Sequence, residues 1–424
     1  MVARIGACRR CRYHFIPHRA HMTPKRKKKK PVPVEAVAEP MPNRIFKPAL
    51  CFIGASEIPL WSLTPVERLR RQFAREGIVQ ELSIEEARWH NGPVIFIRAD
   101  AVIDQPLIPI LAKRPNLLMI GSTAKDTAPL AVQALGRHAD AIVDILQNGG
   151  EPAPELQFLS RTPDQLDAKF WKALRKREVP YAFRLAANNR PEVEWRMFMG
   201  TYKGATDLVT KHFWPRPAFL VTRWLAPRGI TPNMVTLIGA IMVFLAFWFF
   251  LNGQFGLGLL AAWFMTFLDT VDGKLARTTL TSSKWGDVFD HGLDLVHPPF
   301  WYVAWGLGLR QTGYALDSRT FWIAIAAILG GYIVQRLMEG FSIKWLGLEI
   351  HIWRKIDTVF RQITARRNPN LVILTAFTLS GRPDWGLIAV AWWTVICLVL
   401  HGLQLLQALF AQRSGPLESW MAKS

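Results

Sequence analysis

A long run without charged residues sets the strongest limit on the fold. "NMVTLIGAIMVFLAFWFFLNG" (233–253) holds no charged residue, and a helix needs about 20 apolar residues to cross a bilayer. Further apolar runs follow at 255–276, 288–309, 320–338, 370–381 and 385–410. Inside a bilayer a segment must satisfy its own backbone hydrogen bonds, so these runs predict helices. We therefore expect residues 215–412 to form an all-α transmembrane domain with six spans.

Basic residues in the loops indicate how these spans are oriented. Lys and Arg gather before the first span, after the second, and in the connection 336–367, which holds seven of them, whereas the loop 252–256 holds none. Loops rich in Lys and Arg stay on the cytoplasmic side. We expect a multi-pass protein of the cytoplasmic membrane with both termini inside. The amphipathic stretch "RPAFLVTRWLAP" (216–227) is suited to the membrane surface.

The first half of the chain has a different pattern. Residues 1–44, with "PKRKKKKPVP" (24–33), have the composition of a disordered tail, and together with the loops they carry much of the net charge of +20. No nucleic-acid partner is expected for this reason. From 45 to 150 short apolar runs alternate with helical stretches, which predicts an α/β domain with a mainly parallel sheet. We expect 151–214 to be a helical connector and 413–424 a C-terminal tail.

Five aspartates interrupt the apolar pattern in "LDTVDGKLARTTLTSSKWGDVFDHGLD" (268–294). Asp269 and Asp272 are three apart and Asp290 and Asp294 four apart, so each pair shares one face of a helix. Four carboxylates at one place repel each other unless cations lie between them, which predicts a divalent metal site. Oxygen ligands favour Mg²⁺ or Mn²⁺ over zinc. Asp287 is interpreted as a solvated or supporting residue.

The residues between the aspartates suggest a phosphate ligand. Gly273, Ala276 and Gly286 are small enough for a ligand to approach the helix backbone, and Arg277 supplies a planar fork of donors. Together they indicate a pyrophosphate held by metal and arginine, with one carboxylate able to take a proton from an attacking hydroxyl. The alternative is that the aspartates form helix-end salt bridges with neighbouring Lys and Arg.

The spacing D-x2-D-G-x2-A-R-x8-G-x3-D-x3-D, from Asp269 to Asp294, resembles the signature of the CDP-alcohol phosphatidyltransferases at all eight defined positions. "ITPNMVT" (230–236) is similar to a second feature of that family, and the resemblance covers roughly residues 201–412. It implies Mg²⁺-dependent transfer of a phospho-alcohol from a CDP-alcohol to an acceptor alcohol, with release of CMP, by a protein that commonly forms homodimers. It also implies roles by motif position: two Mg²⁺ ions on Asp269, Asp272, Asp290 and Asp294, Asp294 also as general base, and contacts to the CDP group from Gly273, Arg277, Ser283 and Asn233.

The α/β domain is similar in layout to the sugar nucleotidyltransferases, on "FIGASEIPLWSLTPVERLRRQFAREGI" (52–78) and "VIFIRADAVID" (94–104). The second glycine, the loop arginine and the proline–lysine of that pattern are missing, and only Asp100 and Asp104 resemble its acidic end. We therefore expect a degenerate, non-catalytic domain. The fusion resembles the bifunctional inositol-1-phosphate cytidylyltransferase and di-myo-inositol-phosphate phosphate synthase proteins. The donor implied is CDP-diacylglycerol or a CDP-polyol such as CDP-inositol.

Other interpretations stay open at this point. The protein could be truly bifunctional and make its own CDP-alcohol from CTP, or it could be a transporter with acidic ion sites. Transport does not account for the G-x2-A-R between the aspartates. Arg336, Arg366 and Arg367 could bind an acceptor phosphate, although the inside-positive rule explains them equally well.

Overall fold

A computed structural model describes residues 47–122, 128–150, 156–282 and 284–422. The side chains of Lys284, Asp287 and Asp290 are outside this description, and so is Ser283 as a whole. The predicted basic tail, 1–44, lies outside the described residues as well.

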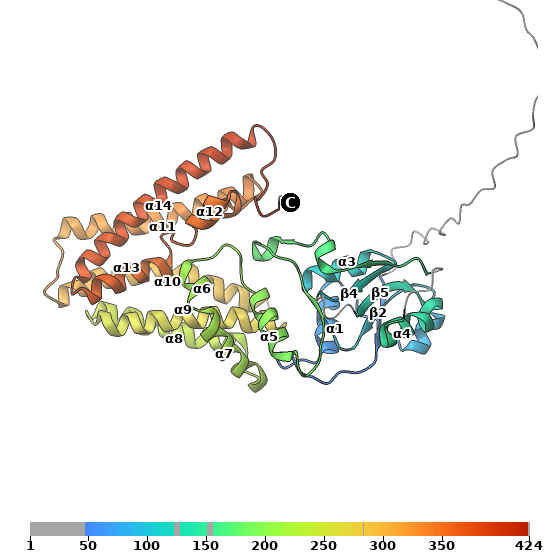
Figure 1. Ribbon diagram of the computed structural model, residues 1–424. Coiled ribbons are helices and arrows are strands. Elements are labelled where there is room, and N and C mark those ends of the chain that lie inside the picture. The colour runs from blue at the N-terminus through green and yellow to red at the C-terminus, as the bar shows by residue number, and fades with distance from the viewer. Residues whose placement is uncertain (1–46, 123–127, 151–155, 283, 423–424) are drawn as a thin grey trace, which may run out of the picture. The chain divides into compact units, whose positions relative to one another are not determined.

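The α/β prediction for the first half of the chain is confirmed. A five-stranded sheet has the order β1 (Ala49–Ile53), β2 (Pro93–Arg98), β5 (Pro129–Leu135), β4 (Leu117–Ile120), β6 (Leu159–Arg161). β1 pairs with β2, and β4 with β6, in parallel, while β5 is antiparallel to both β2 and β4. The sheet, whose strands β2, β5 and β4 are labelled in Figure 1, is thus mixed rather than mainly parallel as predicted, because β5 runs against the other four strands.

Alternate side chains of the strands build two hydrophobic layers, one on each face of the sheet. On one face Ile95 and Ile97 pack with residues of α1 (Pro65–Arg75) and α3 (Ile108–Lys113). On the other face Val94 and Phe96 pack with residues of α2 (Ile84–Trp89) and α4 (Ala139–Asn148). Thr64 and Glu67 form a capping box at the start of α1, which satisfies backbone donors that a helix end leaves open. The domain is therefore a sheet covered by helices on both faces.

The segment 151–214 differs from the expected helical connector. Up to Arg184 it contains short strands, and β9 (Ala182–Arg184) pairs with β3 (Ala101–Ile103). A hairpin joins β7 (Phe170–Trp171) to β8 (Lys176–Arg177), and helices α5 (Arg190–Gly200) and α6 (Leu208–His212) follow. Strands of two or three residues are too short to show an alternating pattern, so only their long-range partners reveal them.

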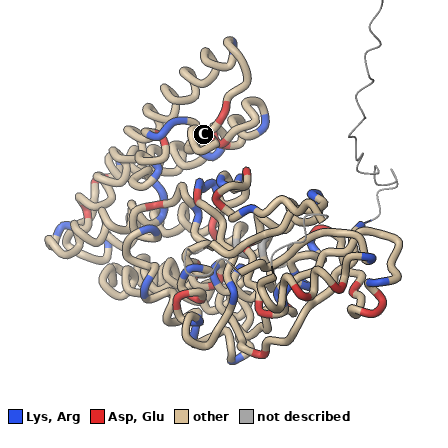
Figure 2. The backbone as a smooth tube through the Cα atoms, turned by 45° about the vertical axis from the view of Figure 1, so that its right-hand side comes forward, with Lys and Arg blue, Asp and Glu red and all other residues tan. Residues whose placement is uncertain are grey.

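The second half of the chain is helical. Its elements are α7 (Pro215–Leu225), α8 (Pro232–Leu251), α9 (Phe255–Thr278), α10 (Lys284–Gly308), α11 (Ser318–Trp345), α12 (Lys355–Phe360), α13 (Arg367–Leu379) and α14 (Pro383–Gln412). Within the described residues four helices, α8, α9, α11 and α14, are long and apolar enough to cross a membrane. Figure 2 shows how few charges these helices carry along most of their length. α10 carries several charges, and the 13 residues of α13 extend only about 20 Å.

The core between the helices is built from large aromatic residues and close backbone contacts. Phe250, Trp301 and Trp305 are buried together, and the indole of Trp301 donates to the Val243 carbonyl at 3.0 Å. Gly308 permits α10 to approach α8, since a Cβ there would lie 1.8 Å from the Phe250 carbonyl oxygen. On α8 Leu237, Phe244 and Trp248 are exposed, as expected of a face that meets lipid.

Three arginines of α1 bind the end of α9. Arg68 donates to the Thr278 carbonyl, and Arg71 Nη1 to the Thr279 carbonyl at 3.1 Å. Arg75 Nη2 donates to Ser282 Oγ at 3.3 Å. The last carbonyls of a helix have no partner within it and carry partial negative charge, so cations stabilise that end. The α/β domain thus holds the loop between the two helices of the aspartate motif.

Candidate active site

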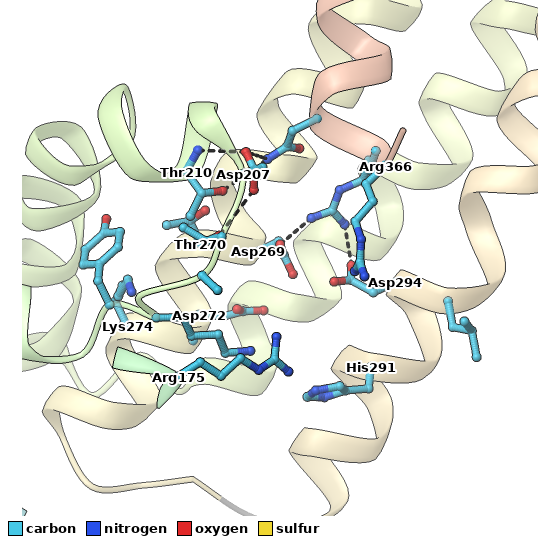
Figure 3. Close-up of a pocket in the computed structure, with 18 of the residues that line it drawn as sticks. Arg175, Asp207, Thr210, Asp269, Thr270, Asp272, Lys274, His291, Asp294 and Arg366 are labelled. Atoms are coloured by element: carbon cyan, nitrogen blue, oxygen red, sulfur yellow. Dashed lines mark hydrogen bonds and ion pairs between the residues drawn. The ribbon is translucent and has the colours of Figure 1, made fainter. Parts of the chain in front are cut away.

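A cavity of about 540 Å³ opens where α9, α10, α11 and the start of α13 come together. The segment 202–210 and the tip of the β7–β8 hairpin complete its wall. Figure 3 shows side chains of Asp269, Asp272 and Asp294 entering this space from two helices. The spacing of the motif predicted that two helix faces would meet, and these three carboxylates line one cavity.

Arg367, at the start of α13, joins the two helices of the motif. Its guanidinium forms ion pairs with Asp269 Oδ2 on α9 and with Asp294 Oδ1 on α10. The side chain of Asp294 is 38% exposed, against 20% for Asp269. Asp294 is therefore the more accessible of the two carboxylates to a molecule entering from water.

Asp272 is the most enclosed of the three. It is 4% exposed, and its Oδ2 accepts a hydrogen bond from Thr236 Oγ1 on α8 at 2.7 Å. Its Oδ1 is buried and has no hydrogen-bond partner within the described part of the chain. A buried carboxylate oxygen without a partner is costly unless a cation or a proton accompanies it.

These features fit a divalent cation through the chemistry of the ligands. Carboxylate oxygens are the ligands that Mg²⁺ prefers, and Asp272 Oδ1 lacks a partner as described above. Among the described side chains no three His, Cys, Asp or Glu converge closely enough to hold a metal ion. Asp290, the fourth predicted ligand, has a side chain that is not described. The metal therefore remains a prediction for which the donor set is suitable.

The residues expected at the CDP group lie around the same cavity. Gly273, Arg277 and Asn233 all line it. A Cβ on Gly273 would lie 2.8 Å from Arg277 Nη2, so the missing side chain lets Arg277 fold back over its own helix. Asn233 is exposed in the first turn of α8, which Thr231 caps by accepting from the Met234 amide. Ser283 lies outside the described residues, whereas its neighbour Ser282 lines the cavity.

A second group of charges lines the cavity, of which the sequence suggested Arg336 and Arg366 as possible phosphate ligands but not Glu339 or His351. Glu339 on α11 forms ion pairs with Arg336 at 3.0 Å and with Arg366, and its Oε1 accepts a hydrogen bond from His351 Nε2 at 2.9 Å. Burial lowers the pKa of His351 to about 3, so its ring is neutral at pH 7. The Arg-rich stretch 336–367 gave a signal, but the inside-positive rule explained it without a ligand.

Among the described residues of this group, Arg361 is the charged side chain with the most buried donors that lack a partner. It is 8% exposed, and its Nε and Nη1 have no hydrogen-bond partner among the described residues. Burial, followed by repulsion from Arg366, lowers the pKa of the Arg361 guanidinium well below its ordinary value. An anion bound in this part of the cavity would relieve both the repulsion and the missing hydrogen bonds.

The fold and the cavity define a helical membrane protein with clustered aspartates and arginines at one site, joined to an α/β domain. Residues 229–365 match the family model described as CDP-alcohol phosphatidyltransferase. The match contains the whole Asp269–Asp294 motif. This similarity points to a transferase.

Several curated proteins are similar to this chain. An archaetidylinositol phosphate synthase of Pyrococcus horikoshii is 40% identical over 122 residues, which is 28% of this chain and 60% of that protein. A phosphatidylinositol phosphate synthase of Streptomyces avermitilis is 36% identical over 95 residues, covering 22% of this chain and 37% of the other. Cholinephosphotransferase 1 of Gallus gallus is 29% identical over 190 residues, covering 41% and 50%. The chain therefore spans between about a third and three fifths of these relatives.

Proposed function

We propose that the protein is an integral-membrane enzyme that transfers a phospho-alcohol from a CDP-alcohol to an acceptor alcohol and releases CMP. One observation carries this proposal. The motif that lies within the matched residues brings Asp269, Asp272 and Asp294 to one cavity, together with Arg277. Salt bridging alone does not explain the site, because Asp272 Oδ1 is buried without a partner among the described residues.

The donor pyrophosphate would be bound on the side of the cavity formed by α9. Arg277 offers a planar set of donors to phosphate oxygens, and Gly273 leaves the room that the Arg277 side chain needs. Asn233 and Gly286 lie on the wall where the rest of the nucleotide would pass. The donor is CDP-diacylglycerol or a CDP-polyol such as CDP-inositol.

Asp269, Asp272, Asp290 and Asp294 would hold two Mg²⁺ or Mn²⁺ ions. When bound, the ions would neutralise charge on the pyrophosphate and orient it. Asp294 would accept the proton of the acceptor hydroxyl, which fits its greater exposure. The acceptor oxygen then bonds to the phosphorus of the phospho-alcohol, the bond from that phosphorus to the CMP oxygen breaks, and Asp294 returns the proton to water.

The acceptor is proposed to be an alcohol that itself carries a phosphate. Support comes from the arginines that face the cavity around Glu339, above all from the unpaired buried donors of Arg361. Two of the relatives are named archaetidylinositol phosphate synthase and phosphatidylinositol phosphate synthase, which agrees with such an acceptor. The site then serves the synthesis of a phospholipid or of an inositol phosphodiester.

The α/β domain is proposed to have no nucleotidyltransferase activity. Asp100 forms ion pairs with Arg98 at 2.8 Å and Arg184 at 3.1 Å. Asp104 is 7% exposed and caps the backbone by accepting from the Gln105 amide at 2.9 Å. Both carboxylates that resemble metal ligands of that family therefore have structural partners. Release of pyrophosphate from CTP by the purified protein would contradict this part of the proposal.

The arrangement in the membrane is also proposed. α10 and α13 would complete six spans with α8, α9, α11 and α14, although only the latter four qualify by length and composition. The basic loops then place the cavity and both termini on the cytoplasmic side. The working unit is proposed to be a homodimer.

Release of CMP by detergent-purified protein tests the proposed activity. CDP-diacylglycerol and CDP-inositol are supplied separately, each with free and phosphorylated polyols as acceptors, with and without Mg²⁺. Asp294→Asn should abolish release. The matched control is Asp317→Asn, because Asp317 caps α11 away from the cavity and Asn caps equally well. The proposal fails if no donor yields CMP, or if Asp294→Asn is as active as the control.

A further inference from the structure

The cavity receives a cation from outside the residues that match the family. Arg175 lies at the tip of the β7–β8 hairpin and lines the cavity, whereas the match begins at residue 229. Figure 3 shows its side chain directed into the space that Asp272 and His291 also border. The hairpin thus adds to the site something that the matched domain does not contain.

The hairpin tip is held firmly against the segment that follows α5. The Gly204 amide donates to the Leu174 carbonyl at 2.9 Å. A Cβ on Gly204 would lie 2.3 Å from the Arg175 carbonyl oxygen, so the contact requires glycine. Phe170, at the base of the hairpin, packs on a buried cluster that includes Ile352 and Met421. These contacts fix where the Arg175 side chain starts.

The backbone of Arg175 is in the left-handed region, with φ 48° and ψ 45°. For a residue with a Cβ this left-handed conformation is unfavourable. Glycine would satisfy the turn without that cost. The turn alone therefore does not explain an arginine at this position.

The side chain of Arg175 is oriented by Glu349, which also lines the cavity. Arg175 Nε lies 2.7 Å from Glu349 Oε2, and the two side chains are 28% and 27% exposed. A guanidinium has five N–H donors in one plane, so a carboxylate at Nε leaves donors on the terminal nitrogens for a second anion. Charged hydrogen bonds of this kind suit a phosphate group.

We propose that Arg175 is a substrate-binding residue that contacts a phosphate group in the cavity, and that Glu349 positions it. The inference rests on the proposed function, because the phosphate belongs either to the donor pyrophosphate or to the phosphorylated acceptor. It assigns part of the substrate specificity to the hairpin Phe170–Arg177 rather than to the matched domain.

Four variants of the full-length protein test this inference: Arg175→Gln, Arg175→Lys, Glu349→Gln and the control Lys172→Gln. Lys172 is an exposed cation in the same hairpin that does not line the cavity. The KM for donor and for acceptor is measured separately, and equilibrium binding of CDP and of inositol phosphate is measured by titration calorimetry. Melting temperatures show whether each variant is folded.

Arg175→Gln should raise one of the two KM values, and weaken binding of the corresponding ligand, by about tenfold or more, since a hydrogen bond to a charged group contributes about 1.5–3 kcal/mol. Arg175→Lys should have a KM and a ligand affinity between those of Arg175→Gln and the native protein, because a lysine keeps the charge but lacks the planar fork. Glu349→Gln should have a smaller effect, and Lys172→Gln none. The ligand whose affinity changes identifies the phosphate.

Unchanged KM values and unchanged binding in Arg175→Gln would overturn the inference, whereas absence of turnover in the native protein would overturn the proposed function and leave the calorimetry to decide on Arg175. The double variant Arg175→Glu with Glu349→Arg tests whether the ion pair only supports the fold or also binds the phosphate. If the exchange restores both ligand affinity and melting temperature, the pair only supports the fold and the inference is wrong.

Discussion

Thr236 on α8 donates a hydrogen bond to Asp272 on α9 across 2.7 Å. The contact links "ITPNMVT" (230–236) to the aspartate motif, through two residues that are 36 positions apart along the chain. The same hydroxyl oxygen, Thr236 Oγ1, lies 3.1 Å from the Pro232 carbonyl oxygen. The hydroxyl therefore fixes one oxygen of Asp272, while the other, Oδ1, has no hydrogen-bond partner among the described residues.

Replacing Thr236 by Val should impair the site while preserving the shape of the side chain. A buried carboxylate that loses its donor is destabilised by about 1.5–3 kcal/mol, so the rate of CMP release should fall about tenfold or more. Thr236→Ser keeps the hydroxyl and should stay close to the native rate. Equal rates for the Val and Ser variants would show that the hydroxyl does not matter. Steady-state kinetics over a range of Mg²⁺ concentrations provides the measurement.

Arg367→Gln should make the stability of the protein depend on divalent cations. The substitution leaves Asp269 and Asp294 without the cation that joins them. Breaking a fully buried pair costs about 3–5 kcal/mol, and these partly exposed pairs should cost less because water screens them. We expect a lower melting temperature in EDTA, and a larger rise on addition of Mg²⁺ than the native protein shows. Arg382→Gln is a matched control, because Arg382 pairs with Asp384 outside the cavity. A melting temperature for Arg367→Gln that is insensitive to Mg²⁺ would argue against metal binding at these carboxylates.

Two glycine-to-alanine changes should have opposite consequences. At Gly273 the added methyl group meets only the flexible end of Arg277, which can move. The protein should stay folded, but displacement of Arg277 should raise the KM for the CDP-alcohol several-fold. At Gly308 the methyl group meets the Phe250 backbone at 1.8 Å, so α8 and α10 must separate. Gly308→Ala should lower the melting temperature strongly, by the mechanism of overpacking. Kinetics and thermal unfolding are measured on both variants. A strong fall in the melting temperature of Gly273→Ala, or a native melting temperature for Gly308→Ala, would contradict the prediction.

Asp104→Asn should stabilise the α/β domain at high pH. Burial raises the pKa of Asp104 to about 6, against about 3.9 in an unfolded chain. Because the folded-state pKa is the higher one, stability is fully present below pH 3.9 and is lost as the pH rises through 6. The difference between the two pKa values corresponds to about 3 kcal/mol at full ionisation. Asn keeps the cap on Gln105 without the charge. Its gain in melting temperature should therefore be larger at pH 8 than at pH 5, and an equal gain at both would contradict the assignment.

Much of this architecture could be predicted from local patterns. The apolar runs gave the positions of six helices, because a bilayer imposes a length that the sequence displays directly, but only α8, α9, α11 and α14 are long and apolar enough to cross a membrane. The aspartates could be placed on common helix faces because spacings of three and four are geometric. Thr236 lies in the stretch "ITPNMVT" (230–236), which the sequence pointed to, but its hydrogen-bond partner depends on how α8 packs on α9, which no local pattern reveals.

Contacts between distant segments account for what the sequence did not show. Arg175 lies in a hairpin of two-residue strands, inside a segment expected to be helical. Its approach to Glu349 spans 174 positions of the chain. Likewise the arginines around Glu339 have the composition of an ordinary cytoplasmic loop, and only packing turns them toward one cavity.

The hydrogen bonds from the arginines of α1 to the end of α9 have a consequence for how the protein folds during its synthesis. A ribosome completes the α/β domain before it begins the membrane helices, and domains generally fold in that order. Arg68, Arg71 and Arg75 are therefore already in place on a folded helix when Thr278 and Thr279 are synthesised. A gene rearranged so that the membrane helices came first would insert α9 with its terminal carbonyls uncovered. The order of the two halves along the gene thus favours binding of α9 to an α/β domain that has already folded.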